Sequence, residues 1–77
     1  MHYLDAAVLM DDEFGWDVCM LDTQKTGKIK VTKPDGDIEF LSKEEFVAVA
    51  KEMWNTAKDN GLDAEYAKEI EDSYKII

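Results

Sequence analysis

The sequence predicts a small α+β domain, in which a three-stranded antiparallel sheet packs on a C-terminal pair of helices. Two patterns predict this class. Apolar and polar residues alternate through the middle of the chain, as in a sheet with one solvated face. Apolar residues recur at three- and four-residue spacing in the C-terminal part, as in amphipathic helices. The chain has 77 residues, 45% of them apolar, which predicts one compact domain over 1–77, near the lower size limit for a self-supporting core.

The N-terminal segment fits either a short helix or a fourth strand. On a helix, four apolar side chains would share one face, with Leu4 and Val8 beside it: Tyr3, Ala7, Met10 and Phe14. On a strand, the apolar run 6–10 would form a hairpin through the turn at 11–15. We favour the helix.

Three stretches alternate with a period of two and predict strands at about 16–21, 28–33 and 37–41. The residues expected on the core face of the sheet are Trp16, Val18, Met20, Ile29, Val31, Ile38 and Phe40. A tight turn is expected between the last two strands, with Pro34 at its first corner and Gly36 at positive φ.

Lysines dominate the solvent face of the middle strand. We expect Lys28 and Lys30 to lie between carboxylates of the two neighbouring strands, Asp17 on one side and Asp37 or Glu39 on the other. Opposite charges across strands stabilise a sheet by roughly 0.2–1 kcal/mol per pair. The lysine cluster is therefore interpreted as the middle of a charge ladder rather than as a phosphate site.

Local end signals predict the two C-terminal helices. Ser42 and Glu45 form the pattern of a capping box, which starts a helix at about 43–59. Asn60-Gly61 is a typical helix stop. A second helix follows at about 63–75, so that the two form an αα-hairpin. The first helix carries a wide apolar stripe that includes Phe46, Val49, Ala50, Met53, Trp54 and Ala57.

The segment from Asp22 to Lys33 shares several letters with a calcium-binding EF-hand loop. Asp22, Gly27 and Ile29 stand at the first, sixth and eighth positions of such a loop. The twelfth position, which needs a bidentate glutamate, holds Lys33 instead. Pro34 then prevents the helix that would follow the loop. We therefore expect no metal and no cofactor, and interpret the segment as a turn followed by a strand.

The charge of the chain is strongly and unevenly acidic. Eighteen acidic residues oppose nine lysines, with no arginine, for a formal net charge of -9. Residues 1–24 carry -6, residues 25–33 carry +4 and residues 34–77 carry -7. This balance disfavours direct binding to nucleic acid or to an anionic membrane, because both need positive charge. It favours a protein partner with a basic surface.

The residue types that carry catalysis are scarce. His2 is the sole histidine and lies at the chain end, and Cys19 is the sole cysteine. Ser42 is used as a helix cap. We therefore expect no enzymatic activity. A single cysteine forms no internal disulfide, and no apolar run is long enough to span a membrane, so we expect a cytoplasmic protein.

Two functions remain. The first is a structural or regulatory subunit that acts through protein–protein contacts, with a possible homodimer formed through the sheet edge or the helix of Trp54. The second is a phage or mobile-element inhibitor of the anti-CRISPR or anti-restriction type, which occupies the nucleic-acid-binding surface of a nuclease by charge mimicry. This second reading rests on size, charge and architecture alone. The candidate partner-binding residues are Asp11, Asp12, Glu13, Glu65, Glu69, Asp72 and Trp54.

Overall fold

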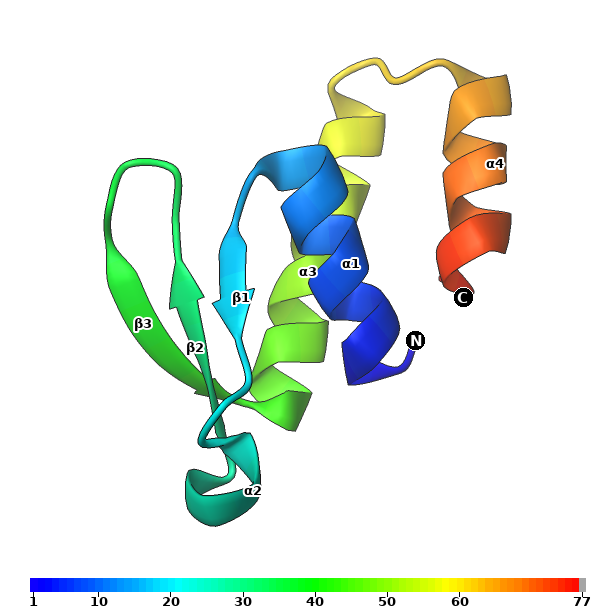
Figure 1. Cartoon of the computed structure of the whole chain (residues 1–77). Coiled ribbons are helices and arrows are strands. Elements are labelled where there is room, and N and C mark those ends of the chain that lie inside the picture. Colours follow the sequence, from blue (N-terminus) through cyan, green and yellow to red (C-terminus); the bar gives the residue numbers. More distant parts are fainter. Residues whose placement is uncertain (77) are drawn as a thin grey trace.

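The computed structural model describes residues 1–76 and confirms the α+β class. The elements in chain order are α1 (Tyr3–Phe14), β1 (Asp17–Cys19), α2 (Thr23–Thr26), β2 (Lys28–Thr32), β3 (Ile38–Ser42), α3 (Lys43–Asp59) and α4 (Ala64–Tyr74). The three strands form an antiparallel sheet in the order β1-β2-β3. The sheet lies on one side of α1 and α3, and α4 lies on the other (Figure 1). Of the C-terminal pair, α3 is the helix that supports the sheet.

The N-terminal segment is a helix, and the alternative of a fourth strand is excluded. The four residues expected on its buried face lie in or against the core, but the most buried side of the helix is shifted from them. Ala6, Leu9 and Met10 are fully buried, whereas Leu4 and Val8 are 51% and 48% exposed. The helix is therefore rotated relative to the predicted face, because both α3 and α4 pack against it.

The strands β1 and β2 present the expected residues to the core. Val18 pairs with Val31 across the two strands. Ile29 and Val31 are fully buried, and Trp16, just before β1, is 6% exposed. They form the larger core cluster with residues of α1 and α3, namely Ala6, Met10, Phe46 and Ala50.

The third strand presents the opposite face from the one expected. Val31 pairs with Glu39 and Ile29 with Leu41, so Ile38 and Phe40 point away from the core and are 52% and 63% exposed. The hairpin loop explains this. Lys33 pairs with Asp37 around three loop residues, 34–36, with Gly36 at φ 93°. With an odd number of loop residues, odd-numbered residues of β2 stand opposite odd-numbered residues of β3. The predicted core face, with Ile29 and Val31 beside Ile38 and Phe40, requires an even number of loop residues.

The charge ladder is also wrong in this register. Lys30 stands opposite Cys19 on one side and Phe40 on the other, and Lys28 stands opposite Ser42. Both lysines are exposed as expected, but neither faces a carboxylate across a strand. The ion pairs of the hairpin are instead Lys33 with Glu39, and Lys28 with Glu45 at 3.7 Å.

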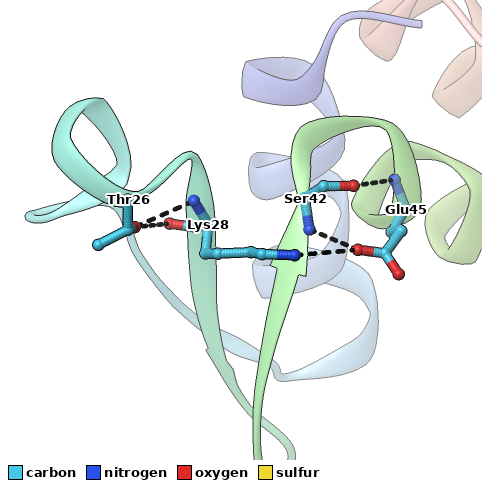
Figure 2. Close-up of polar contacts among 4 residues, drawn as sticks. All are labelled: Thr26, Lys28, Ser42 and Glu45. Atoms are coloured by element: carbon cyan, nitrogen blue, oxygen red, sulfur yellow. Dashed lines mark hydrogen bonds and ion pairs between the residues drawn. The ribbon is translucent and has the colours of Figure 1, made fainter.

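Lys28 joins the sheet to the start of α3 through its ion pair with Glu45. The predicted capping box is present: the Glu45 backbone N–H donates to Ser42 Oγ at 3.1 Å, and the Ser42 backbone N–H donates to Glu45 Oε1 at 2.9 Å. Figure 2 shows Lys28 reaching the same Glu45 carboxylate from β2. The hydrogen bond from the Ser42 backbone N–H holds the pKa of the Glu45 carboxyl below its ordinary value, and the Ser42 side chain and the charge of Lys28 add to this effect.

The segment that resembles a calcium loop contains a single helical turn, α2, where the sequence suggested only a turn. Thr26 Oγ1 donates to the Asp22 backbone carbonyl at 3.0 Å. It also accepts from the Lys28 backbone N–H at 3.0 Å (Figure 2). The hydroxyl that would stand at the fifth ligand position is thus used by the backbone. Within residues 1–76, no three His, Cys, Asp or Glu side chains are grouped so as to hold a metal ion.

Candidate interaction surface

Two of the predicted acidic segments, far apart in the sequence, lie next to each other in the fold. The C-terminal end of α1 contacts α4 through a second, smaller core cluster made of Leu9, Trp54 and Ala67. Asp12 and Glu13 follow Leu9 by three and four residues, which places them on the flank of α1 that faces α4. Ala67 lets the two helices approach closely because its side chain is small.

Two tyrosines of α4 bind these two carboxylates. The Tyr66 hydroxyl donates a hydrogen bond to Glu13 Oε1, and the Tyr74 hydroxyl donates to Asp12 Oδ2 at 3.0 Å. Tyr66 and Tyr74 are two helical turns apart, so both hydroxyls reach the same side of α4. Their spacing in the sequence indicates a shared face, but their carboxylate partners could be identified only in the fold.

The tyrosine contacts shift the acid–base properties of the phenols. The hydrogen bond to Glu13 raises the pKa of Tyr66, and burial together with the negative charges of Glu13 and Glu69 adds to the shift. Burial raises the pKa of Tyr74, with further contributions from the hydrogen bond to Asp12 and from the Asp12 and Glu13 charges. Both phenols thus stay neutral donors over the physiological range of pH.

Three further candidate partner-binding residues, on α4, extend this region outward. Asp63 caps the helix, with its Oδ1 accepting from the backbone N–H of Glu65 at 2.8 Å and of Tyr66 at 3.3 Å. Behind this cap, Glu65, Glu69 and Asp72 are exposed. We call the set formed by both helices the acidic surface; its members are Asp12, Glu13, Glu65, Glu69 and Asp72. Asp11 is exposed at the end of α1, but the two tyrosines bind its neighbours.

Trp54 is not available to a partner, which corrects its inclusion among the binding residues. Its side chain is 1% exposed and its Nε1–H donates to Glu71 Oε2 at 3.3 Å. Lys58 Nζ donates to the same oxygen at 2.7 Å. These two hydrogen bonds, with the charge of Lys58, lower the pKa of Glu71. Glu71 therefore attaches α4 to α3, and the turn at Asn60-Gly61 folds α4 over the tryptophan.

The ion pairs of the described residues all lie outside the acidic surface, although further carboxylates elsewhere, such as Glu44 and Glu52, also have no lysine partner. Three glutamates, Glu39, Glu45 and Glu71, each pair with a lysine within 4 Å. Within residues 1–76, no member of the acidic surface has a lysine at that distance. Its negative charge is thus compensated by phenolic hydrogen bonds at Asp12 and Glu13, and by solvent elsewhere.

No protein-family model matches the chain, and the searches of curated proteins and of solved structures also gave no match. The length and hydropathy of the helices were compared with those of a membrane span. None of the helices in the described part of the chain is long and apolar enough to cross a membrane.

Proposed function

We propose that this chain is a small, non-enzymatic interaction protein, a structural or regulatory subunit of the cytoplasm that binds a basic protein surface through its acidic surface. The observation that carries the proposal is that five carboxylates from α1 and α4 lie on one side of the molecule with no lysine within 4 Å among the described residues. An uncompensated cluster of one sign attracts a partner of the opposite sign and speeds the encounter.

The experiment compares two charge variants of equal net charge. In the first, Glu65 and Glu69 become Gln and Asp72 becomes Asn. In the control, three exposed acidic residues on the outer side of α3 are changed in the same way: Glu44, Glu52 and Asp59. Partners are captured from host lysate at low and at high salt, and the affinity of the purified complex is then measured.

The proposal expects binding that weakens steeply with salt, because charges at an exposed contact are screened over about 10 Å at 0.1 M ionic strength. It also expects the α4 variant to lose affinity and the α3 control to keep it. Equal affinities of the two variants would contradict the role of the acidic surface, and so would binding that is insensitive to salt.

A second candidate function is inhibition of a nuclease by charge mimicry, as expected of some phage or mobile-element proteins. It is supported by the spacing of the exposed carboxylates on α4, which repeat by four and three residues along one face. Carboxylates held about 5–6 Å apart on a helix approach the charge spacing of a phosphate backbone. Competition separates the two functions. A mimic is displaced from its purified partner by duplex DNA or by single strands, whereas a subunit bound elsewhere on the partner stays bound.

A further inference from the structure

We propose that the chain forms a two-fold symmetric dimer through the free edge of β3, pairing the β3 strands of two copies into one six-stranded sheet. This inference concerns a different surface from the acidic one, and it stands independently of the proposed basic partner. In the order β1-β2-β3, the strand β3 is an edge strand. Among the described residues, Figure 1 shows no other segment beyond β3 on that side.

The direction of the backbone groups of β3 follows from the hairpin. The Lys33 backbone N–H donates to the Asp37 carbonyl at 2.8 Å, so this is a hydrogen-bonded pair. Hydrogen-bonded and non-hydrogen-bonded pairs alternate along an antiparallel ladder. Ile38 and Phe40 therefore stand in non-hydrogen-bonded pairs with β2, and their N–H and C=O groups point to the free edge. Ser42, which has the same parity, confirms this direction because its N–H is bonded by Glu45 outside the sheet.

The edge thus combines unpaired backbone groups with exposed apolar side chains. The N–H groups of Ile38 and Phe40 have no partner within residues 1–76, and their side chains are 52% and 63% exposed on the uncovered face of the sheet. Edge strands of this kind pair with other strands unless charge, proline or a covering segment prevents it. The proline of this hairpin, Pro34, lies in the loop and not in the strand.

One register of self-pairing uses all four free backbone groups of each copy, the N–H and C=O of Ile38 and of Phe40. When two β3 strands run antiparallel about an axis at Glu39, Ile38 of each copy stands opposite Phe40 of the other. Both are then hydrogen-bonded pairs, which gives four backbone hydrogen bonds and two Ile–Phe contacts across the interface. The two Glu39 side chains meet at the axis, and each is neutralised by the Lys33 of its own copy.

Charge favours a second copy at this edge over any other part of the molecule. Residues 25–42, which contain β2, β3 and their loop, hold four lysines and three acidic residues and carry +1, whereas the rest of the chain carries -10. Two copies of a chain with net charge -9 repel one another. The near-neutral hairpin is where they approach with the least repulsion, since the acidic surface lies on the far side of α1.

The first test measures mass against concentration by sedimentation equilibrium. The wild-type mass should rise from the monomer value of 8.8 kDa toward twice that value. The variant Ile38→Lys places two new charges in the interface and should weaken the dimer by more than about tenfold. The control Val8→Lys makes the same change at a site of similar exposure, 48%, on α1 and should leave the dimer unchanged. Both sites are half exposed, so both variants should fold.

The second test determines the register in a Cys19→Ser background. The variant Glu39→Cys places two thiols opposite each other in a non-hydrogen-bonded pair, whose Cα atoms are about 4.5 Å apart. This distance lies within the range of about 4.4–6.8 Å that disulfides span. It should form a cross-linked dimer rapidly under mild oxidation. The control Asp35→Cys lies in the exposed loop beyond Asp37. At 3.4 Å per strand residue the two copies of Asp37 already stand about 14 Å apart, so the two thiols at 35 lie farther apart still and should cross-link only slowly.

Three results would overturn the proposal. The first is a wild-type mass that stays monomeric at the highest concentration reached. The second is a dimer that Ile38→Lys and Val8→Lys affect equally, which would assign the contact to another surface. The third is cross-linking of Asp35→Cys as fast as that of Glu39→Cys. None of these three results bears on the binding of a basic partner to the acidic surface, because that binding is measured with other variants.

Discussion

Leu9 should be the residue of α1 that holds α4 in place, and its truncation to alanine tests this reading of the fold. The side chain is fully buried and lies between Trp54 and Ala67 in the smaller core cluster. Leu-to-Ala changes in cores cost about 2–5 kcal/mol, from lost burial plus the cavity left behind. A 77-residue domain has a total stability on the order of 4–12 kcal/mol. The change should therefore remove a large fraction of the free energy of unfolding.

The matched control lies on the same helix. Leu4→Ala is the same substitution with the same change of helix propensity, but Leu4 is 51% exposed. It should alter the stability by no more than about 0.5 kcal/mol. With about 4–8 °C of melting temperature per kcal/mol for a domain of this size, a loss of about 3 kcal/mol at Leu9 lowers Tm by about 12–24 °C.

The assay is thermal and urea unfolding followed by circular dichroism, with amide hydrogen exchange as a second readout. Exchange should accelerate first in α4, because α4 has its main apolar contact at this cluster. Equal Tm values for Leu9→Ala and Leu4→Ala would refute the burial argument. A large loss of Tm with uniform exchange along the chain would refute the specific role of Leu9 in holding α4.

Three other predictions follow from the contacts. Ser42→Ala removes the capping hydroxyl of α3 and should cost about 0.5–2 kcal/mol in urea unfolding. Glu71→Gln loses the ionic bond to Lys58. The pKa of Glu71 is lowered in the fold, so the carboxylate stabilises the fold above the ordinary Glu pKa of about 4.3, and this stabilisation is lost as pH falls through the lowered pKa. Wild type and variant should therefore differ in stability at pH 7 and converge in acid, and a constant difference would contradict the assignment. The pKa of Tyr66 is raised, so the stabilisation from its hydrogen bond to Glu13 is fully present below about pH 10 and is lost as pH rises through the raised pKa. Glu13→Gln should therefore lower the pKa of Tyr66, as measured by an ultraviolet absorbance titration.

The elements that could be predicted from the sequence are those with local end signals. The helix α3 has the predicted bounds, 43–59, because the capping box at Ser42 and the Asn60-Gly61 stop both act within one helical turn. The second C-terminal helix and the three strands lie within a few residues of their expected positions. In each of these cases the residues that specify the element are neighbours in the sequence.

The errors concern which face of an element is buried, and this depends on distant contacts. Two apolar stripes compete on α1, and packing against α3 and α4 selects the one with Leu9 over the one with Leu4. Trp54 belongs to the apolar stripe of α3 and was also a candidate partner-binding residue, because nothing near it in the sequence indicates that α4 folds over it. The carboxylates of the acidic surface come from two stretches far apart in the sequence, 12–13 and 65–72. Their union depends on the hydrogen bonds of Tyr66 and Tyr74 to a helix more than 50 residues away.

The inverted face of β3 has a consequence for the edge of the sheet, because loop length controls side chains and backbone groups together. With an even loop, Ile38 and Phe40 would be buried and bonded to β2, and Glu39 would stand among the outward-pointing residues, where its charge would protect the edge. The three-residue loop 34–36 reverses both properties. It turns Ile38 and Phe40 outward at the positions whose N–H and C=O groups are free, and it places Glu39 on the core side, paired with Lys33. The loop thus removes the charge that protects an edge strand and exposes apolar side chains beside unpaired backbone groups, which is the arrangement that a second β3 strand completes.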